Sequence, residues 1–228
     1  MVSPQRVGPE SGAVLWLTQF VSPLPAAWIE QQLQSFSASE AQRLARIRRP
    51  LRREQFVVGH ALLRRLLKSL GLIDPKIEVA PNGRPHLAGV HLRGFRQLSL
   101  AHSRTTVAAL ASCEPAGVDV EVHRTLRDPA GVLALLHADP NVIAAEAGTD
   151  PSEAALKCWV AAEAGAKARN AGCDPGASRV NRLALWNSCW ICVAGTANSP
   201  ATVVSDPLRE TYNSTPLKWM AATGLQGP

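Results

Sequence analysis

Two acidic side chains stand at alternate positions in the segment Gly117-Val118-Asp119-Val120-Glu121. In a β-strand alternate side chains point to the same face, so the carboxylates of Asp119 and Glu121 face the same way, with Cα atoms about 7 Å apart. Two like charges on one face repel, and a hard divalent cation with oxygen ligands, such as Mg²⁺, would resolve that repulsion. Taken alone, the pattern also fits a solvated strand face.

A third acid lies on a helix predicted at residues 151–171. Glu163 stands four residues before Lys167, a spacing that places both side chains on one face and suits an ion pair. The neighbouring residues are mostly alanines, so these two charges stand out on an apolar helix. In isolation the pair also fits an ordinary surface contact.

Two further positions could contact a phosphate group. The strand predicted at residues 97–101 ends at His102-Ser103, whose imidazole and hydroxyl can donate hydrogen bonds to an anion. A turn predicted at residues 82–85 contains Gly83-Arg84-Pro85 and exposes a cation. Strand ends and turns of this kind are also common in proteins without a phosphate site.

The order of these motifs is more specific than any one of them. His102-Ser103, then Gly117-x-Asp119-x-Glu121, then Trp159-x3-Glu163-Ala164-x2-Lys167 resemble the signature of the 4'-phosphopantetheinyl transferase superfamily, in its long, two-lobed, surfactin-synthetase-activating branch. An upstream helix with Gly59-x2-Leu62-Leu63-Arg64 and the Gly83-Arg84-Pro85 turn fit the same family. The resemblance covers residues 37–172.

The resemblance implies an enzyme that transfers phosphopantetheine from coenzyme A, its substrate, to a serine of an acidic acyl or peptidyl carrier protein and releases 3',5'-ADP. It implies that Asp119, Glu121 and Glu163 hold Mg²⁺. Glu163 and a metal-bound water are both candidates for the base that accepts the serine proton. The motifs leave open which carrier is modified and whether Mn²⁺ replaces Mg²⁺.

The resemblance also implies contacts with coenzyme A. Lys167 matches a catalytic lysine that contacts a phosphate, and His102 and Ser103 match residues that contact phosphate or ribose. Arg84 matches the turn beside the adenine. Arg43 lies where the family has a basic residue for the 3'-phosphate.

The sequence departs from the family pattern at three positions. The family usually has lysine at Ala162, arginine at Gln55 and a basic residue at Glu40. Three nearby arginines are candidates to replace the missing cations: Arg46, Arg52 and Arg53. Without such a replacement, the chain would be a catalytically impaired homologue that binds coenzyme A or a carrier protein, and this alternative stays open.

Hydrophobic spacing and turn signals predict a strand at 14–20, helices at 26–33 and 52–70, and a capping box from Ser37 to Glu40. Strands follow, then a second run of helices and strands, which predicts an α+β fold. We expect two similar lobes related by a pseudo-twofold axis, each a helix with antiparallel strands. The lobes are residues 1–113, with the basic helix, and 114–228, with the acids, and the active site lies between them. By analogy with the family, we expect a monomer.

Charge is distributed unevenly along the 228 residues, which carry a formal net charge of +6. Eight arginines lie between Arg43 and Arg65, with Glu54 as the single acid among them. Such a block attracts anions, such as a phosphorylated small molecule or an acidic protein, although basic helices are often simply solvated. A nucleic-acid-binding protein is the other alternative, but no aromatic stacking platform accompanies these arginines, so we expect no nucleic-acid partner.

The five cysteines show no spacing typical of a disulfide framework. Cys189 and Cys192 form a lone C-x2-C without a second pair, which favours buried free thiols over a zinc site. No apolar run approaches the roughly 18 residues of a spanning helix. We therefore expect a cytoplasmic protein without a membrane segment.

Overall fold

The computed structural model describes residues 12–89, 94–137, 150–172, 179–196, 201–205 and 219–221. The helices are α1 (Ala26–Leu33), α2 (Ala38–Ala45), α3 (Pro50–Ser69), α4 (Pro129–Leu135) and α6 (Pro151–Arg169). The strands are β1 (Ala13–Gln19), β2 (Ile77–Val79), β3 (Pro85–Leu87), β4 (Gln97–Ser103), β5 (Thr106–Ser112), β6 (Ala116–Val122), β7 (Arg179–Trp186), β8 (Cys189–Thr196), β9 (Ala201–Ser205) and β10 (Trp219–Ala221).

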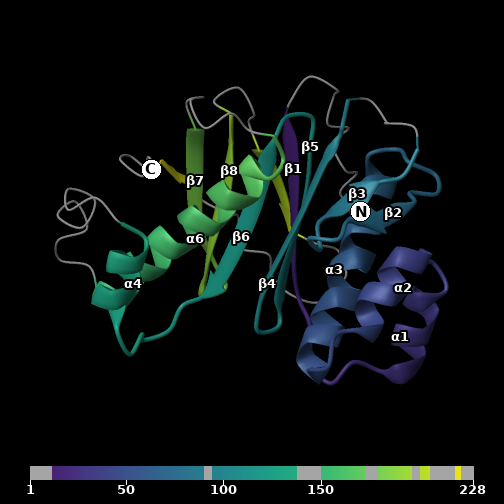
Figure 1. The fold of residues 1–228 in the computed structure, drawn as a ribbon, viewed down its shortest axis with the longest axis horizontal. Helices are drawn as coiled ribbons and strands as arrows, with labels where there is room; N and C mark the ends of the chain where they lie inside the picture. Colours follow the sequence, from purple (N-terminus) through teal and green to yellow (C-terminus); the bar gives the residue numbers. More distant parts are fainter. Residues whose placement is uncertain are drawn as a thin grey trace.

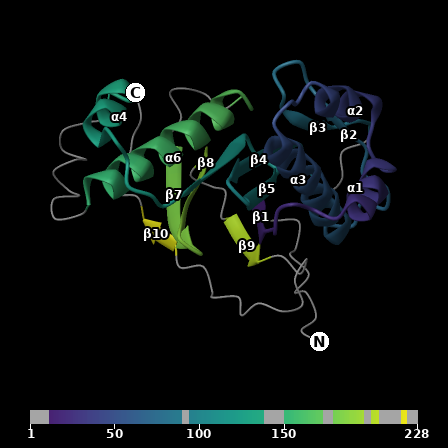
Figure 2. The same cartoon turned by 90° about the horizontal axis from the view of Figure 1, so that it is seen from below.

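The strands form two four-stranded sheets and a small hairpin. The first sheet has the order β4-β5-β1-β9, the second has the order β10-β7-β8-β6, and β2 pairs with β3. The pairs are antiparallel apart from β1 with β9, which is parallel. In Figure 1, α3 covers the first sheet and α6 the second, and Figure 2 shows the same layers from below. The predicted α+β class is confirmed.

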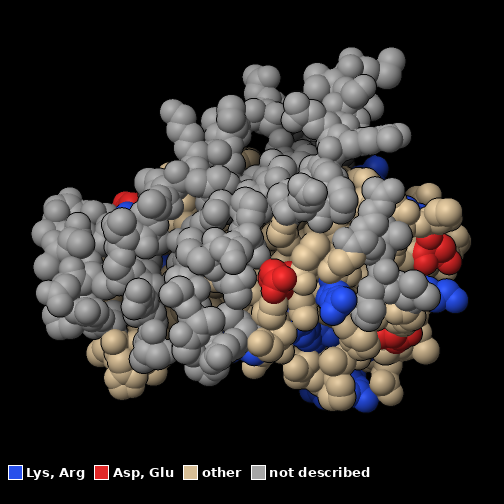
Figure 3. Space-filling view, turned by 90° about the horizontal axis from the view of Figure 1, so that it is seen from above, with Lys and Arg blue, Asp and Glu red and all other residues tan. Residues whose placement is uncertain are grey.

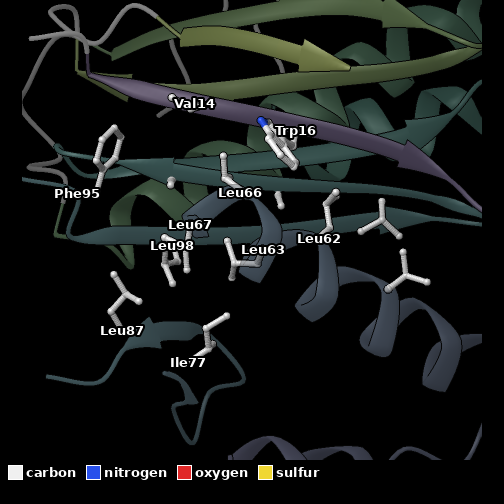
Figure 4. Close-up of a cluster of buried hydrophobic side chains, with 14 of the residues drawn as sticks. Val14, Trp16, Leu62, Leu63, Leu66, Leu67, Ile77, Leu87, Phe95 and Leu98 are labelled. Atoms are coloured by element: carbon white, nitrogen blue, oxygen red, sulfur yellow. The ribbon is translucent and has the colours of Figure 1, made fainter. Parts of the chain in front are cut away.

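Helix α3 packs its apolar face on the first sheet. Pro50 is its first residue, where a missing N–H costs no hydrogen bond. A buried cluster of α3, sheet and hairpin side chains fills the space between them, and Figure 4 shows its members Val14, Trp16, Leu62, Leu63, Leu66, Leu67, Ile77, Leu87, Phe95 and Leu98. The predicted capping box opens α2, where Ser37 and Glu40 exchange hydrogen bonds between side chain and backbone.

The inner faces of the two sheets share a second apolar cluster. Leu15, Leu110 and Ala101 from the first sheet meet Val118, Val120 and Ile191 from the second. The burial of Val118 and Val120 confirms the predicted alternation along β6, because Asp119 between them is on the opposite face, toward α6.

Strands β4 and β6 meet along a seam that side chains close. The hydroxyl of Ser99 accepts a hydrogen bond from the Val118 N–H at 3.2 Å, and that of Ser103 accepts from the Val122 N–H at 3.1 Å. Serine oxygens thus satisfy backbone groups on β6 that its neighbour in the second sheet, β8, does not pair. This seam joins the two sheets beside the site described below.

Helix α6 lies unusually close to β6 at Gly117. A Cβ placed on this glycine would stand 2.3 Å from the Ala164 carbonyl oxygen and 2.6 Å from the Ala168 nitrogen. Any side chain at this position would therefore push the helix away from the sheet. The glycine of the Gly117-x-Asp119-x-Glu121 motif is needed for packing, and it brings Lys167 of α6 down onto β6.

Three other predictions concern sequence features outside the site. Cys189 and Cys192 are both buried and belong to apolar clusters on opposite faces of the second sheet, which agrees with the favoured alternative of buried thiols. The second run of helices that the sequence predicts includes helical stretches at about residues 129–147; of these, α4 spans Pro129–Leu135, and residues 138–149 lie outside the described part. Within the described residues, no helix has both the length and the apolar character needed to cross a bilayer.

Candidate functional site

A pocket of about 430 Å³ opens where the two sheets and α3 meet. Its wall comes from α2, α3, the turn before β3, β4, β6 and α6, so residues from both halves of the chain line it. The charged side chains in its wall are four cations and one acid: Arg43, Arg52, Arg84, Lys167 and Asp119. A pocket with this surplus of positive charge suits a negatively charged ligand.

Two of the cations, Arg43 and Arg84, lie at the turn at residues 80–84. Arg43, at the end of α2, stacks its guanidinium against Gly83, where a Cβ would lie 3.1 Å from Nη2. Gly83 has a φ of +87°, a conformation that favours glycine. Arg84 donates a hydrogen bond to Oε1 of Gln97 at 2.8 Å, and burial lowers the pKa of its guanidinium. Two of the predicted coenzyme A contacts therefore line one side of the pocket.

Arg52 of α3 reaches into the pocket beside His102. Its Nη1 lies 2.8 Å from Nδ1 of His102 and donates to Oε1 of Gln55 at 3.1 Å. Burial, with the charges of Arg52 and Lys167, lowers the pKa of His102 to about 4. Burial and the nearby charge of Arg43 also lower the pKa of Arg52. These cations therefore repel one another in the absence of an anion.

Lys167 binds three oxygens at the seam between the sheets. Its ammonium donates to Oδ1 of Asp119 at 2.7 Å, to the carbonyl of Val118 at 3.1 Å and to that of Leu100 at 3.4 Å. An ammonium has three N–H groups, so these contacts use all of them. Among the described residues, the ion pair of Lys167 is therefore with Asp119 rather than with Glu163, the partner that helical spacing predicted.

The negative charge of the buried Asp119 carboxylate is disfavoured in this arrangement. Its side chain is 11% exposed, and burial raises its pKa to about 6 even though Lys167 acts in the opposite direction. The negative charges of Glu121 and Glu163 raise it further. Glu121 and Glu163 are therefore close enough to disfavour the charged form of Asp119, an effect that a bound cation would relieve.

Carboxylate oxygens suit a hard divalent ion, and two of these acids, Asp119 and Glu121, already form contacts within the protein. Glu121 accepts hydrogen bonds from Ser103 at 2.8 Å and from Arg124 at 2.7 Å. Among residues that the structure describes, no set of three or more carboxylate, imidazole or thiol groups is arranged to hold a metal ion. These contacts use Oε2 of Glu121 and Oδ1 of Asp119, and each carboxylate has a second oxygen that can bind a cation.

His102 and Ser103 lie on opposite faces of β4. His102 points toward α3 and lines the pocket, whereas Ser103 is outside the pocket lining and binds β6 and Glu121. Strand alternation separates any two adjacent side chains in this way. Of this predicted pair, the structure brings only His102 into the pocket.

Two of the three departures from the family pattern, at Glu40 and Gln55, have structural explanations. Glu40 is completely buried and pairs with His60 and Arg64, so it does not face the pocket. Gln55 donates to the Arg104 carbonyl at 2.6 Å and so ties the β4–β5 turn to α3.

Of the three arginines expected to compensate for these departures, Arg52 lines the pocket. Arg53 donates instead to the carbonyls of Leu44 and Ile47. Arg46 is exposed and is not part of the pocket wall.

Sequence reasoning missed Ser99, Arg124 and Asn170. Ser99 closes the seam and lines the pocket, Asn170 ends α6 at the pocket, and Arg124 holds Glu121. The period of two along β4 could have placed Ser99 on the face of Ser103, toward β6. Arg124 follows Glu121 by three residues, but no strand pattern predicts a contact beyond the strand end.

No family model matches the chain, and no curated protein matches it. The assignment of a function therefore depends on the motifs and on the pocket that brings several of them together.

Proposed function

We propose that this chain is a magnesium-dependent 4'-phosphopantetheinyl transferase that acts on a carrier protein. The main support is a single pocket that combines arginines with an acid whose charge is disfavoured. Arg43, Arg52 and Arg84 suit the phosphates of coenzyme A, and Asp119 beside Glu121 suits a metal ion on a pyrophosphate. Residues of both halves line the pocket, which supports the expected interface of two related lobes.

The reaction is a displacement at phosphorus. The hydroxyl oxygen of a carrier serine attacks the β-phosphorus of coenzyme A, a new P–O bond forms, and the P–O bond to 3',5'-ADP breaks. The serine proton passes to Glu163 or to a water. Catalysis of this kind is mainly positioning and charge neutralisation, which the arginines and Lys167 supply from fixed elements.

Asp119, Glu121 and Glu163 would hold the Mg²⁺. When bound, the ion neutralises charge on the phosphates and so favours attack by the serine oxygen. Lys167 would release one of its carbonyl contacts to reach the phosphate. The contact with Leu100, at 3.4 Å, is the longest of the three and the least costly to give up.

The exposed arginines indicate where an acidic carrier could approach. Arg46, Arg48 and Arg49 lie in the link between α2 and α3, whose Ile47 lines the pocket. Figure 3 shows blue basic side chains, with red acidic ones among them, on the part of the surface that α1–α3 and the β2–β3 hairpin occupy. The three arginines of the link would steer an acidic protein toward the pocket by charge. We expect a monomer in the cytoplasm.

The deciding experiment incubates the protein with coenzyme A, Mg²⁺ and an apo carrier protein, and then weighs the carrier by mass spectrometry. Transfer adds the mass of one phosphopantetheine to the carrier serine. Coenzyme A binding without any added mass would support the impaired homologue, which the occupied donors of Lys167 and the neutral Gln55 favour. If the protein does not bind coenzyme A at all, both the active transferase and the impaired homologue are rejected.

A further inference from the structure

The strongest unexplained feature of the pocket is the contact between two basic side chains, Arg52 and His102. Nη1 of Arg52 and Nδ1 of His102 are 2.8 Å apart, a hydrogen-bond distance. Arginine in proteins is always protonated and has N–H donors but no acceptor. The nitrogen that accepts must therefore be Nδ1 of His102, which carries its lone pair toward Arg52.

This contact fixes the chemistry of the imidazole. A protonated histidine carries hydrogens on both ring nitrogens and could not accept from Arg52. The ring is therefore neutral, with its hydrogen on Nε2. Burial and the charges of Arg52 and Lys167 lower the pKa of His102 to about 4, which agrees with the geometry.

Arg52 is itself held in place by Gln55. The amide nitrogen of Gln55 donates to the Arg104 carbonyl at 2.6 Å, which turns Oε1 toward Arg52. That oxygen accepts from Nη1 at 3.1 Å, so both hydrogens of Nη1 have acceptors, Gln55 and His102. The β4–β5 turn, Gln55, Arg52 and His102 thus form one chain of hydrogen bonds that ends in the pocket.

Positive charge exceeds negative charge around these hydrogen-bonded side chains. Arg43 is close enough to lower the pKa of Arg52, and Lys167 acts on His102, while the nearest acid in the pocket wall, Asp119, is already paired with Lys167. A ligand oxyanion would accept from Nε2–H of His102 and neutralise the arginines. Charge-assisted hydrogen bonds of this kind are the strong ones.

We propose that Arg52 is a positioning residue, which holds His102 as a neutral Nε2–H donor for the phosphate oxyanion that the proposed function expects beside His102, Arg43 and Arg52. The ligand class is a phosphate ester such as adenosine 3',5'-bisphosphate. The identification of this phosphate with part of coenzyme A rests on the proposed function. The fixed tautomer of His102 does not.

The first experiment measures the tautomer directly. Nitrogen-15 NMR of the imidazole, assigned by comparison with His102→Gln, reports which ring nitrogen carries the proton. We expect hydrogen on Nε2 in the wild-type protein, and a mixture of tautomers or a shift toward Nδ1–H in Arg52→Met. Arg53→Met is the matched control, because Arg53 is the adjacent residue and donates to the Leu44 and Ile47 carbonyls instead. An unchanged His102 spectrum in Arg52→Met would overturn the proposal.

The second experiment measures binding of adenosine 3',5'-bisphosphate by calorimetry in EDTA. We expect Arg52→Met and His102→Gln each to weaken binding about tenfold or more, as for hydrogen bonds to charged groups. Because one residue acts partly through the other, the double variant should lose less than the product of the single losses. Arg53→Met should bind as the wild type does. Independent effects, which multiply in the double variant, would refute the coupling.

A conservative variant covers the case in which Arg52→Met does not fold. Arg52→Lys keeps a donor that can reach Nδ1, so the Nε2–H tautomer should remain while bisphosphate binding weakens. Loss of the tautomer in this variant would count against the proposal. If the protein transfers phosphopantetheine but binds the bisphosphate equally well with and without Arg52, this inference alone is rejected. Binding that depends on Arg52 without any transfer would reject the enzyme function alone.

Discussion

Two clusters in this protein contain the same three kinds of side chain, a carboxylate, a histidine and an arginine, and use them in opposite ways. In the first, Glu40 lies at the centre, and its carboxylate binds Nδ1 of His60 at 2.5 Å and the guanidinium of Arg64. The backbone N–H of Ser37 donates to the same group at 2.7 Å. Every charge of this cluster has its partner inside the protein.

In the second cluster, Arg52 binds His102 directly and Asp119 is paired with Lys167. Nδ1 of His60 donates to a carboxylate, whereas Nδ1 of His102 accepts from a guanidinium. The difference lies in the position of the acid. Where the acid stands between the cations, the cluster is complete and stabilises the fold. Where an arginine instead binds a neutral histidine, with a second arginine nearby, the positive charge is left for an anion from outside.

The electrostatics of the two carboxylates differ in the same way. Burial works to raise the pKa of Glu40, but the hydrogen bonds from His60 and Arg64 lower it overall. Burial raises the pKa of Asp119 to about 6, and its partner Lys167 does not compensate. The charged form of Glu40 is thus stabilised by the fold, and that of Asp119 is not.

The largest expected effect is on transfer in Asp119→Asn. We expect the rate to fall at least about a hundredfold, because a bound metal ion contributes several kcal/mol of charge stabilisation. The melting temperature near pH 7 in EDTA should not fall, since the protein already disfavours the charge at this position. Asp119→Ala should abolish transfer as well. Near-normal turnover on an apo carrier protein in either variant would contradict the metal assignment.

The second effect is on stability in Glu40→Ala. Removal of this carboxylate leaves the Arg64 guanidinium buried without its charge partner, which typically costs about 3–5 kcal/mol. Denaturant unfolding measures the loss, and Glu30→Ala on the exposed face of α1 is the matched control. A loss no larger than that of Glu30→Ala would show that the two clusters are not different in kind.

Local signals predicted much of the fold and part of the site. The capping box at Ser37, proline at the start of α6 and alternation along β6 each depend on residues close in sequence, so they could be read before the structure was known. Arg43 and Arg84 were instead predicted from the family resemblance, and the contact of Arg43 with the Gly83 turn joins segments about 40 positions apart.

Contacts between distant segments could not be predicted in this way. Spacing on α6 pointed to Glu163 as the partner of Lys167, but the helix packs so closely on β6 at Gly117 that Asp119 is nearer. Glu40 and Arg64 are 24 positions apart, and only the packing of α2 on α3 brings them together. The pairing of β9 with β1 likewise joins strands from opposite ends of the chain.

A smaller effect should appear in the pH dependence of stability. Because the pKa of His102 is about 4 in the folded protein and near 6.5 when unfolded, only the unfolded chain gains this proton between those values. Stability should therefore rise as the pH increases from about 4 to about 6.5 and change little above that range. The contribution of this group is at most about 3 kcal/mol. Unfolding of wild type and His102→Gln across this range checks it. Equal slopes in the two proteins would contradict the assignment of His102 as a neutral ring.

The smallest expected effect separates the phosphates of the donor. Arg43 packs on the Gly83 turn at the edge of the pocket, where its guanidinium can reach one phosphate without touching the reacting centre. Arg43→Ala should raise the Michaelis constant for coenzyme A about tenfold, the value of one charge-assisted hydrogen bond, and that for dephospho-coenzyme A much less. Equal increases in the Michaelis constants for the two donors would show that Arg43 does not bind the 3'-phosphate. Arg52 and His102 would then be the groups that bind it.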